Sequence, residues 1–323
     1  MLKKESRFRL DNIGMKIVFM GTPEFALPSL KTLAESRHQI LAVVTAMDAE
    51  KGRGLIVQET PVKTLAKELN LPVFQPPDLK SPDFIRQMKD LNADLFIVVA
   101  FRILPVDLLE IPRYGAINLH ASLLPKYRGA APINWAIING EKETGLTIFR
   151  LQARVDTGDI LFQKKTAILP EDTFGMLYEK LSCLGGESLV RVVNEIEEKR
   201  LEPIPQRHEL ATQAPKIFPE MGEIDWRKGA LSIKNLIHGL SPTPGAYSFF
   251  GKKRIKFLSA VAKSGGNSKT HGAIVIRKKN WLGIQTGDGI LFPKEVQSEG
   301  KKPLSIDEFL RGYQGKVGDI FSR

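Results

Sequence analysis

Short apolar runs that alternate with amphipathic segments constrain the fold of this chain more than any other feature of its sequence. The apolar runs are rich in β-branched residues, as expected of strands buried on both faces of a parallel sheet. They lie at residues 16–20, 40–44, 95–100 and 115–120, and the segments between them at 26–36, 61–70 and 81–91 have helical spacing. This βαβ order predicts an α/β fold with an open, doubly wound, mostly parallel sheet of the Rossmann-like kind.

The pattern changes after residue 140. Segments 146–152 and 159–165 predict a pair of strands joined by a turn at Asp156-Thr157-Gly158, and residues 173–199 predict a long helix. From about residue 231, one helix precedes several short strand candidates with Gly-rich turns. Short strands of this kind predict a smaller C-terminal β-barrel, similar to an oligonucleotide-binding fold.

Two domains and a short N-terminal extension follow from this organisation. We predict an N-terminal extension at 1–14, a catalytic domain at 15–205 and a basic C-terminal domain at 206–323. The segment at about 201–230 is rich in proline at its start and has little periodicity, so it is interpreted as the linker. Because the sequence from Met15 onward reads as the opening of a domain, translation from Met15 is an alternative explanation for the extension.

Positive charge is concentrated in the C-terminal third. Of 47 Lys+Arg residues 20 lie at 206–323, against only 10 of 36 Asp+Glu residues, so this part carries +10 of the net charge of +11. A basic module attached to a neutral one indicates a polyanionic partner such as a nucleic acid. A surface charge that only keeps the protein in solution explains the same count equally well.

The chain has a single cysteine, Cys183, which cannot form an internal disulfide and fits a reducing compartment. We expect it to be a small buried residue on a helix. No apolar run approaches the roughly 20 residues that span a bilayer, and the segment before Met15 lacks the apolar core of a secretory signal. These observations predict a cytoplasmic protein without a membrane segment.

Asn118 and His120 are the first candidates for chemistry. The first βα turn, at 21–26, has only the first glycine of a G-x-G-x-x-G motif, which argues against a nicotinamide cofactor. Ligands of open α/β sheets bind beyond the carboxyl ends of the strands. Strand alternation puts Asn118 and His120 on the same side at such an end, where they could hold an oxyanion and handle a proton. Ordinary hydrogen bonding within a turn is the alternative explanation.

The sequence NLHASLLPKYRGAAPINWAIINGEKETGLTI, followed by VDTGDILFQ, resembles the signature region of the 10-formyltetrahydrofolate-dependent formyltransferases, in particular those that act on methionyl-tRNA. The likeness extends from Met15 and includes FMGTPEFA, the KGRG loop and the segment at 214–226. It implies transfer of a formyl group from 10-formyltetrahydrofolate, as co-substrate and without a metal, to the amine of methionyl initiator tRNA by a monomer.

Three other functions stay open. Formyl transfer to a small amine, such as an amino-sugar nucleotide, and hydrolysis of formyltetrahydrofolate use the same folate chemistry. A tRNA-binding protein with a decayed folate site is the non-enzymatic alternative. The basic C-terminal domain favours tRNA, since a small acceptor gives no reason for it.

The resemblance also implies roles for individual residues. Asn118, His120 and Asp156 correspond to the catalytic set, with Asp156 orienting and charging His120 or holding a water that relays a proton. The loop at 100–105 is one residue shorter than the Ala-Tyr-Gly-x-Ile-Leu-Pro of relatives. The residues expected to bind folate are Ser122, Leu123, Leu124, Pro125, Phe101, Ile103, Leu104 and Val155.

Two groups of cations are expected to contact tRNA. Lys51 and Arg53 belong to a loop after the second strand, which enters the acceptor end in the family that this chain resembles. A solvated loop is the plainer explanation for Arg53. The second group lies in the C-terminal third and comprises Lys216, Lys252, Lys253 and Arg254.

Overall fold

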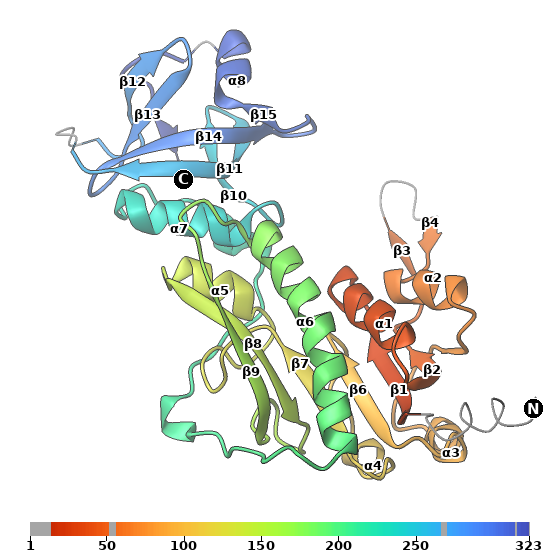
Figure 1. Cartoon of the computed structure of the whole chain (residues 1–323). Helices are drawn as coiled ribbons and strands as arrows, with labels where there is room; N and C mark the ends of the chain where they lie inside the picture. The colour runs from red at the N-terminus through yellow and green to blue at the C-terminus, as the bar shows by residue number, and fades with distance from the viewer. Residues whose placement is uncertain (1–13, 52–55, 266–269, 314, 323) are drawn as a thin grey trace, which may run out of the picture. The chain divides into compact units, whose positions relative to one another are not determined.

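The computed structural model describes residues 14–51, 56–265, 270–313 and 315–322, and it divides into two compact units (Figure 1). The first unit takes in the chain up to residue 128 together with 145–165 and 178–213. The second consists of 129–144, 166–177 and 214–323. The functional border expected between residues 205 and 206 stays a prediction, and the extension at 1–14 lies almost wholly outside the described residues.

A sheet in the order β5-β2-β1-β6-β7-β8-β9 forms the centre of the first unit. β1 pairs in parallel with both β2 and β6, β6 pairs in parallel with β7, and β7 pairs with β8 in the antiparallel sense. The chain therefore winds outward from β1 in two directions, which confirms the predicted doubly wound, mostly parallel sheet. The strands are β1 (Lys16–Gly21), β2 (Gln39–Val44), β5 (Val73–Phe74), β6 (Leu95–Val99), β7 (Ala116–His120), β8 (Glu143–Arg150) and β9 (Ile160–Ala167).

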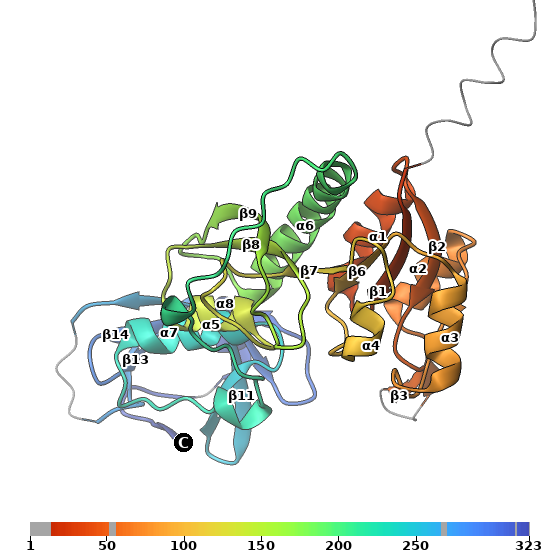
Figure 2. The same cartoon turned by 90° about the horizontal axis from the view of Figure 1, so that it is seen from below.

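Helices cover both faces of this sheet (Figures 1 and 2). On one face Phe84 of α3 and Leu108 of α4 share a buried cluster with Val18 of β1. On the other face α6 approaches so closely that a Cβ on Gly185 would lie 2.4 Å from Leu119 of β7. The helices are α1 (Leu27–Ala34), α2 (Pro61–Glu68), α3 (Pro82–Asp90), α4 (Val106–Leu109) and α6 (Phe174–Glu197).

The second unit contains an antiparallel sheet in the order β12-β13-β14-β11-β10-β16, with β15 paired to β14. Trp226, Phe257 and Phe321 pack against one another in its core, together with apolar residues of α7. The predicted helix followed by a small C-terminal barrel is confirmed. The elements are α7 (Ala230–Leu240), β10 (Ala246–Phe250), β11 (Lys253–Lys263), β12 (Ile274–Lys278), β13 (Trp281–Gln285), β14 (Ile290–Ser298), β15 (Leu304–Ser305), α8 (Ile306–Gly312) and β16 (Phe321–Ser322).

Helix α5 (Pro132–Ile138) belongs to the second unit, although it precedes α7 by about a hundred residues. The Asn134 amide donates a hydrogen bond of 2.7 Å to the carbonyl of Gly239 in α7. A Cβ on Gly239 would lie 2.6 Å from Ile138, so glycine permits the close contact of the two helices.

Cys183 does not lie where the sequence predicted it. The described part of α6 buries Leu177, Leu181, Leu189 and Val193, and Cys183 is exposed. Two residues beyond Leu181 correspond to about 200° of rotation around a helix, so Cys183 faces solvent. No helix among the described residues is both long enough and apolar enough to cross a membrane.

His238 of α7 makes the stability of the second unit depend on pH. Its side chain is 3% exposed and its Nε2 lies 3.2 Å from the backbone nitrogen of Ala260. Burial, helped by the charge of Lys234, lowers the pKa of His238 from 6.5 to about 4. The unfolded chain therefore takes up a proton at a higher pH than the folded chain.

We expect this contribution to be complete above pH 6.5 and to be lost as the pH falls to 4, by an amount of the order of 3 kcal/mol. All three tryptophans lie in the second unit, so their fluorescence during urea unfolding reports on it. A His238→Gln variant should lose less stability than the wild type over this pH range. Parallel pH profiles for the two proteins would contradict the assignment.

Candidate functional site

The carboxyl end of β7 holds Asn118 and His120. His120 is 6% exposed, its Nε2 lies 2.8 Å from the carbonyl oxygen of Tyr127, and its ring meets Phe149 edge-on. Asn118 is partly exposed, and its side chain hydrogen-bonds to no other residue that the structure describes. The imidazole is thus fixed by the protein, whereas the amide of Asn118 is available to a ligand.

Asp156, which the family resemblance implied as the partner of His120, lies beside it. Asp156 is 8% exposed, and its Oδ2 is 3.9 Å from Nδ1 of His120. When Nε2–H donates to the Tyr127 carbonyl, a neutral imidazole directs the lone pair of Nδ1 toward Asp156. At 3.9 Å the Nδ1 and Oδ2 atoms are within ion-pair distance but too far apart for a direct hydrogen bond.

A strained turn places Asp156. Its φ of +53° lies in the left-handed region, which costs energy for a residue other than glycine. At Gly158 an added Cβ would lie 1.8 Å from the carbonyl oxygen of Arg150, so only glycine fits there. Gln206 holds the turn from outside, since its Nε2 donates to the carbonyls of Asp156 and Gly158 at 3.1 and 2.7 Å.

Arg128 is a buried cation that sequence reasoning missed. Its Nη2 donates 2.6 Å to Oε1 of Gln206 and lies 2.9 Å from Nδ1 of His208. Burial lowers the pKa of the Arg128 guanidinium, and the charge of Asp156 opposes that shift. Its position inside the KYRG part of the signature was the available signal, but nothing in the sequence linked it to Gln206, 78 residues away.

Buried hydrogen bonds hold the turn at 122–125 in place. Ser122 is fully buried, and Leu124 is 3% exposed. The hydroxyl of Thr147 donates to the carbonyl of Ser122 at 2.7 Å and accepts from the nitrogen of Leu124 at 3.0 Å and from Gln163 at 2.9 Å. Of the four residues expected to bind folate here, only Leu123 and Pro125 have partly exposed side chains.

The shortened loop at 100–105 presents apolar surface. Arg102 donates to the carbonyls of Pro76 and Pro77 at 2.8 and 3.2 Å and lies over the ring of Phe101. Leu104 is buried, but Ile103 is 72% exposed. Val155, which precedes the Asp156 turn, is 48% exposed. Exposed aliphatic side chains near a polar site fit an apolar part of a ligand.

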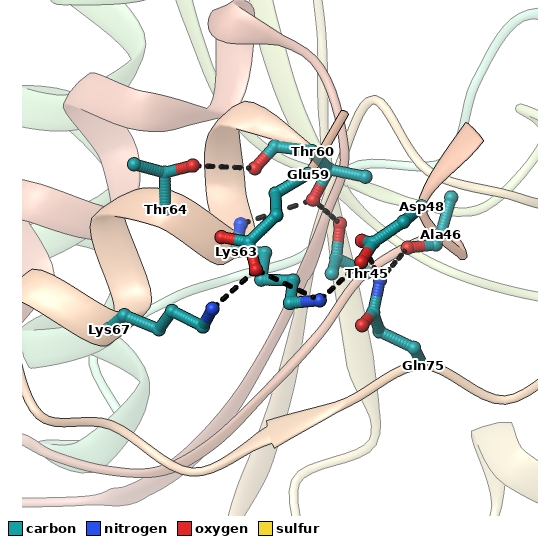
Figure 3. Close-up of polar contacts among 9 residues, drawn as sticks. All are labelled: Thr45, Ala46, Asp48, Glu59, Thr60, Lys63, Thr64, Lys67 and Gln75. Carbon is teal, nitrogen blue, oxygen red and sulfur yellow. Dashed lines mark hydrogen bonds and ion pairs between the residues drawn. The ribbon is translucent and has the colours of Figure 1, made fainter. Parts of the chain in front are cut away.

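A polar network fastens both ends of the segment that contains the short strands β3 (Ala49–Lys51) and β4 (Ile56–Gln58) (Figure 3). The hydroxyls of Thr45 and Thr60 are 2.8 Å apart, which joins the start of the segment to its end. Gln75 donates to the carbonyl of Ala46 at 2.6 Å and to Asp48 at 2.7 Å.

Lysines of α2 complete this network. Lys63 pairs with Asp48 and with Glu59, and Lys67 pairs with Glu59. Hydrogen bonding to Lys63 lowers the pKa of Asp48, and hydrogen bonding to Lys67 lowers that of Glu59. Of the two cations predicted here, Arg53 lies outside the described residues, and the side chain of Lys51 does as well.

The remaining predicted cations lie in the second unit. Lys252 and Lys253 are exposed at the turn between β10 and β11. Arg254 follows them but is engaged with Glu299 at 3.3 Å and lies over the ring of Tyr247. Lys216 is exposed, and its ammonium lies 5.6 Å from the ring centre of Phe218. Within the described part of the chain, no three His, Cys, Asp or Glu side chains are grouped as metal ligands would be.

Comparison with known families decides what kind of chain this is. The family described as formyl transferase matches residues 15–193, and the formyl transferase C-terminal domain matches residues 216–314. The chain belongs to the formyl transferase family. The resemblance found in the sequence is therefore confirmed.

Curated relatives of this formyl transferase are similar along almost its whole length. A methionyl-tRNA formyltransferase of Caldanaerobacter subterraneus subsp. tengcongensis is 46% identical over 308 residues, which are 95% of this chain and 99% of that protein. A methionyl-tRNA formyltransferase of Acetivibrio thermocellus is 42% identical over 311 residues, which are 96% and 100% of the two chains.

Solved structures share the fold at low identity. An N-formyltransferase from Helicobacter canadensis, in complex with folinic acid and dTDP-3-aminofucose, matches with a TM-score of 0.66 at 19% identity over 86% of this chain and 98% of its own. HypX from Aquifex aeolicus in complex with tetrahydrofolic acid matches with a TM-score of 0.62 at 18% identity over 96% of this chain and 51% of its own. At these identities the likeness concerns the fold alone.

Thr147 offers a test of how the turn at 122–125 is held. A Thr147→Val variant leaves the nitrogen of Leu124 without its acceptor, at a cost of about 1–3 kcal/mol. We expect amide hydrogen exchange in residues 122–126 to accelerate roughly tenfold or more. Thr147→Ser retains the hydroxyl and is the matched control. Equal exchange rates in the two variants would show that the hydroxyl does not hold the turn.

Proposed function

We propose that this formyl transferase moves the formyl group of 10-formyltetrahydrofolate to the α-amino group of methionyl initiator tRNA. One observation carries the proposal. Relatives 41–46% identical over 94% or more of the chain are methionyl-tRNA formyltransferases by name. The structure of HypX with tetrahydrofolic acid supports folate as the co-substrate. A cytoplasmic, monomeric enzyme that needs no metal completes the proposal.

The residues at the end of β7 fit this reaction. An α-amino group has a pKa of about 8, so roughly a tenth of it is neutral and nucleophilic at pH 7. Its nitrogen bonds to the formyl carbon, and the carbonyl oxygen becomes an oxyanion. The free amide of Asn118 is a donor for that oxyanion, and a protonated His120 adds positive charge.

The intermediate then collapses with a transfer of one proton. The bond between the formyl carbon and the folate nitrogen breaks, and the amine proton ends on that nitrogen. His120 and Asp156 lie 3.9 Å apart at this end of the strand, and we assign the relay of that proton to these two groups. Gln206 and Arg128 act as positioning residues, because they hold the Asp156 turn without reaching the reacting atoms themselves.

Folate binding is assigned to the apolar surfaces beside this centre. Ile103 and Val155 are exposed aliphatic groups that would contact the pterin, with Phe101 and Leu104 behind them. Leu123 and Pro125 would line the slot, while the buried Ser122 and Leu124 would shape the turn.

Binding of tRNA is assigned to two basic groups. Lys51 and Arg53 would meet the acceptor end from the segment fastened by α2. Lys216, Lys252, Lys253 and Arg254 would contact the backbone from the domain at 206–323, which carries most of the net charge.

A formylation assay tests the proposed function directly. The purified chain is given labelled 10-formyltetrahydrofolate with charged initiator tRNA, charged elongator tRNA and amino-sugar nucleotides in parallel. Label on initiator methionyl-tRNA alone is the expected result. Label on an amino-sugar nucleotide, or release of formate without an acceptor, would replace the proposed acceptor. No turnover at all would favour a binding protein with a decayed site.

Replacing His120 or Asn118 by alanine should lower kcat by a factor of about 100–1000, since each change removes an electrostatic contribution in the transition state. The KM for tRNA should change little. Circular dichroism controls for folding. Activity close to that of the wild type in either variant would rule out the assigned mechanism.

Lys63 should matter for tRNA more than its charge alone explains. It joins Asp48 and Glu59 at the two ends of the fastened segment, whereas Lys67 meets only Glu59. A Lys63→Met variant should raise the KM for tRNA roughly tenfold through misplacement of the segment, with little change in the KM for folate. Lys67→Met removes the same charge and is the control. The same increase in both variants would point to charge instead of position.

A further inference from the structure

An exposed tryptophan of the second unit is surrounded by lysines that no sequence motif singled out. Trp281 of β13 is 37% exposed. The ammonium of Lys294, on β14, lies 5.0 Å from its ring centre, and that of Lys263, on β11, lies 5.2 Å from it. Trp281, Lys263 and Lys294 together form the Trp281 surface. Their strands lie side by side in the sheet (Figure 1).

The packing of the sheet fixes the indole. Phe292 of β14 meets Trp281 edge-on, with ring centres 5.5 Å apart. Gly283 makes room for the Phe292 ring, because a Cβ at position 283 would lie 3.1 Å from that ring. Val261 is paired with Phe292 across the strands and is itself 38% exposed. The indole is therefore a preformed part of the sheet surface.

The two ammonium groups have no carboxylate partner in the described part of the chain. Among the residues that the structure describes, no carboxylate lies within ion-pair distance of Lys263 or Lys294. An aromatic ring attracts a cation through its quadrupole but has no net charge to neutralise it. The indole thus holds two like charges at one ring and neutralises neither of them.

Several other cations of this chain are paired with carboxylates. Lys63 and Lys67 are paired with Asp48 and Glu59, and Arg254 is paired with Glu299. The Trp281 surface differs from these groups because its cations are ordered without being compensated. Such an arrangement lowers the entropy cost of binding an anion, and the attraction between the anion and the two ammonium groups is not reduced by a neighbouring carboxylate.

We propose that the Trp281 surface is a subsite for the phosphate backbone of tRNA. In it, Lys263 and Lys294 bind phosphates, and the ring of Trp281 positions the two ammonium groups. This inference rests on the proposed function, since it extends the tRNA contacts beyond the turn at 252–254. Lys278 is paired with Trp281 across β12 and β13 and adds a third exposed cation. Proteins that bind nucleic-acid strands commonly combine a basic surface that tracks the backbone with exposed aromatic rings.

The salt dependence of tRNA binding tests the proposal on the full chain. Each lysine that contacts a phosphate contributes about one to the slope of log Kd against log salt concentration. A Lys263→Gln/Lys294→Gln variant should therefore reduce that slope by about two. Lys301→Gln/Lys302→Gln removes the same charge from an exposed turn of the same unit and should leave the slope nearly unchanged. If both double variants reduced the slope equally, the effect would come from the overall positive charge of the unit, and the proposal would be wrong.

A second variant separates positioning from charge. Trp281→Leu leaves the net charge unchanged but removes the ring, so tRNA affinity should fall several-fold, and Trp281→Phe should restore part of it. Wild-type affinity in Trp281→Leu would overturn the role of the ring. If the double lysine variant loses binding to anionic vesicles but not to tRNA, the surface is a lipid site and the proposal fails.

The proposed function and this inference fail in different ways. If the wild-type chain binds no tRNA, both the proposed function and the Trp281 subsite are wrong. If the wild-type chain formylates initiator tRNA but the double lysine variant binds tRNA with the same salt dependence as the wild type, only the Trp281 subsite is wrong.

Discussion

Strand β7 pairs in parallel with β6 on one side and in the antiparallel sense with β8 on the other, and the candidate site depends on this change of direction. A parallel neighbour leaves the carboxyl end of β7 open to a ligand. The antiparallel β8 runs back along β7, from Thr147 beside His120 to Arg150 beside Ile117, and the turn that follows β8 then brings Asp156 to His120. His120 and Asp156 thereby come within 3.9 Å of each other although they are 36 positions apart in the sequence.

Buried polar groups determine how precisely this turn is placed. Gln206 receives hydrogen bonds from Arg128 and donates its own to the backbone of the turn. A buried network of this kind is favourable only while every member is satisfied. The left-handed Asp156 is held in its conformation by these bonds and by the close contact at Gly158. The local strain and the network that maintains it thus belong to the same few residues.

Much of the fold could be predicted, because long buried strands and amphipathic helices have a clear periodicity. The segment at 81–91 is an example, since it has helical spacing and α3 occupies it, with Ser81 accepting a hydrogen bond from Phe84 at its start. Strands β3, β4 and β5 have only two or three residues and carry no period to detect. At the site, strand alternation alone paired Asn118 with His120, whereas Asp156 came from a family resemblance. The role of Gln206 could not be predicted from the sequence, because its contacts with the Asp156 turn span about fifty residues.

The discontinuous second unit has a consequence for how the chain is made on the ribosome. Asn134 of α5 finds its partner in α7 only 105 residues later in the chain. At roughly 5–20 residues per second, synthesis of that stretch takes about 5–20 seconds. During this interval the apolar face of α5 has no α7 to pack against, while the strands of the first sheet up to β9 have already been synthesised. The nascent chain is therefore most open to chaperones, and to misassembly with its neighbours on the same messenger RNA, after its catalytic residues have emerged and before its last domain has.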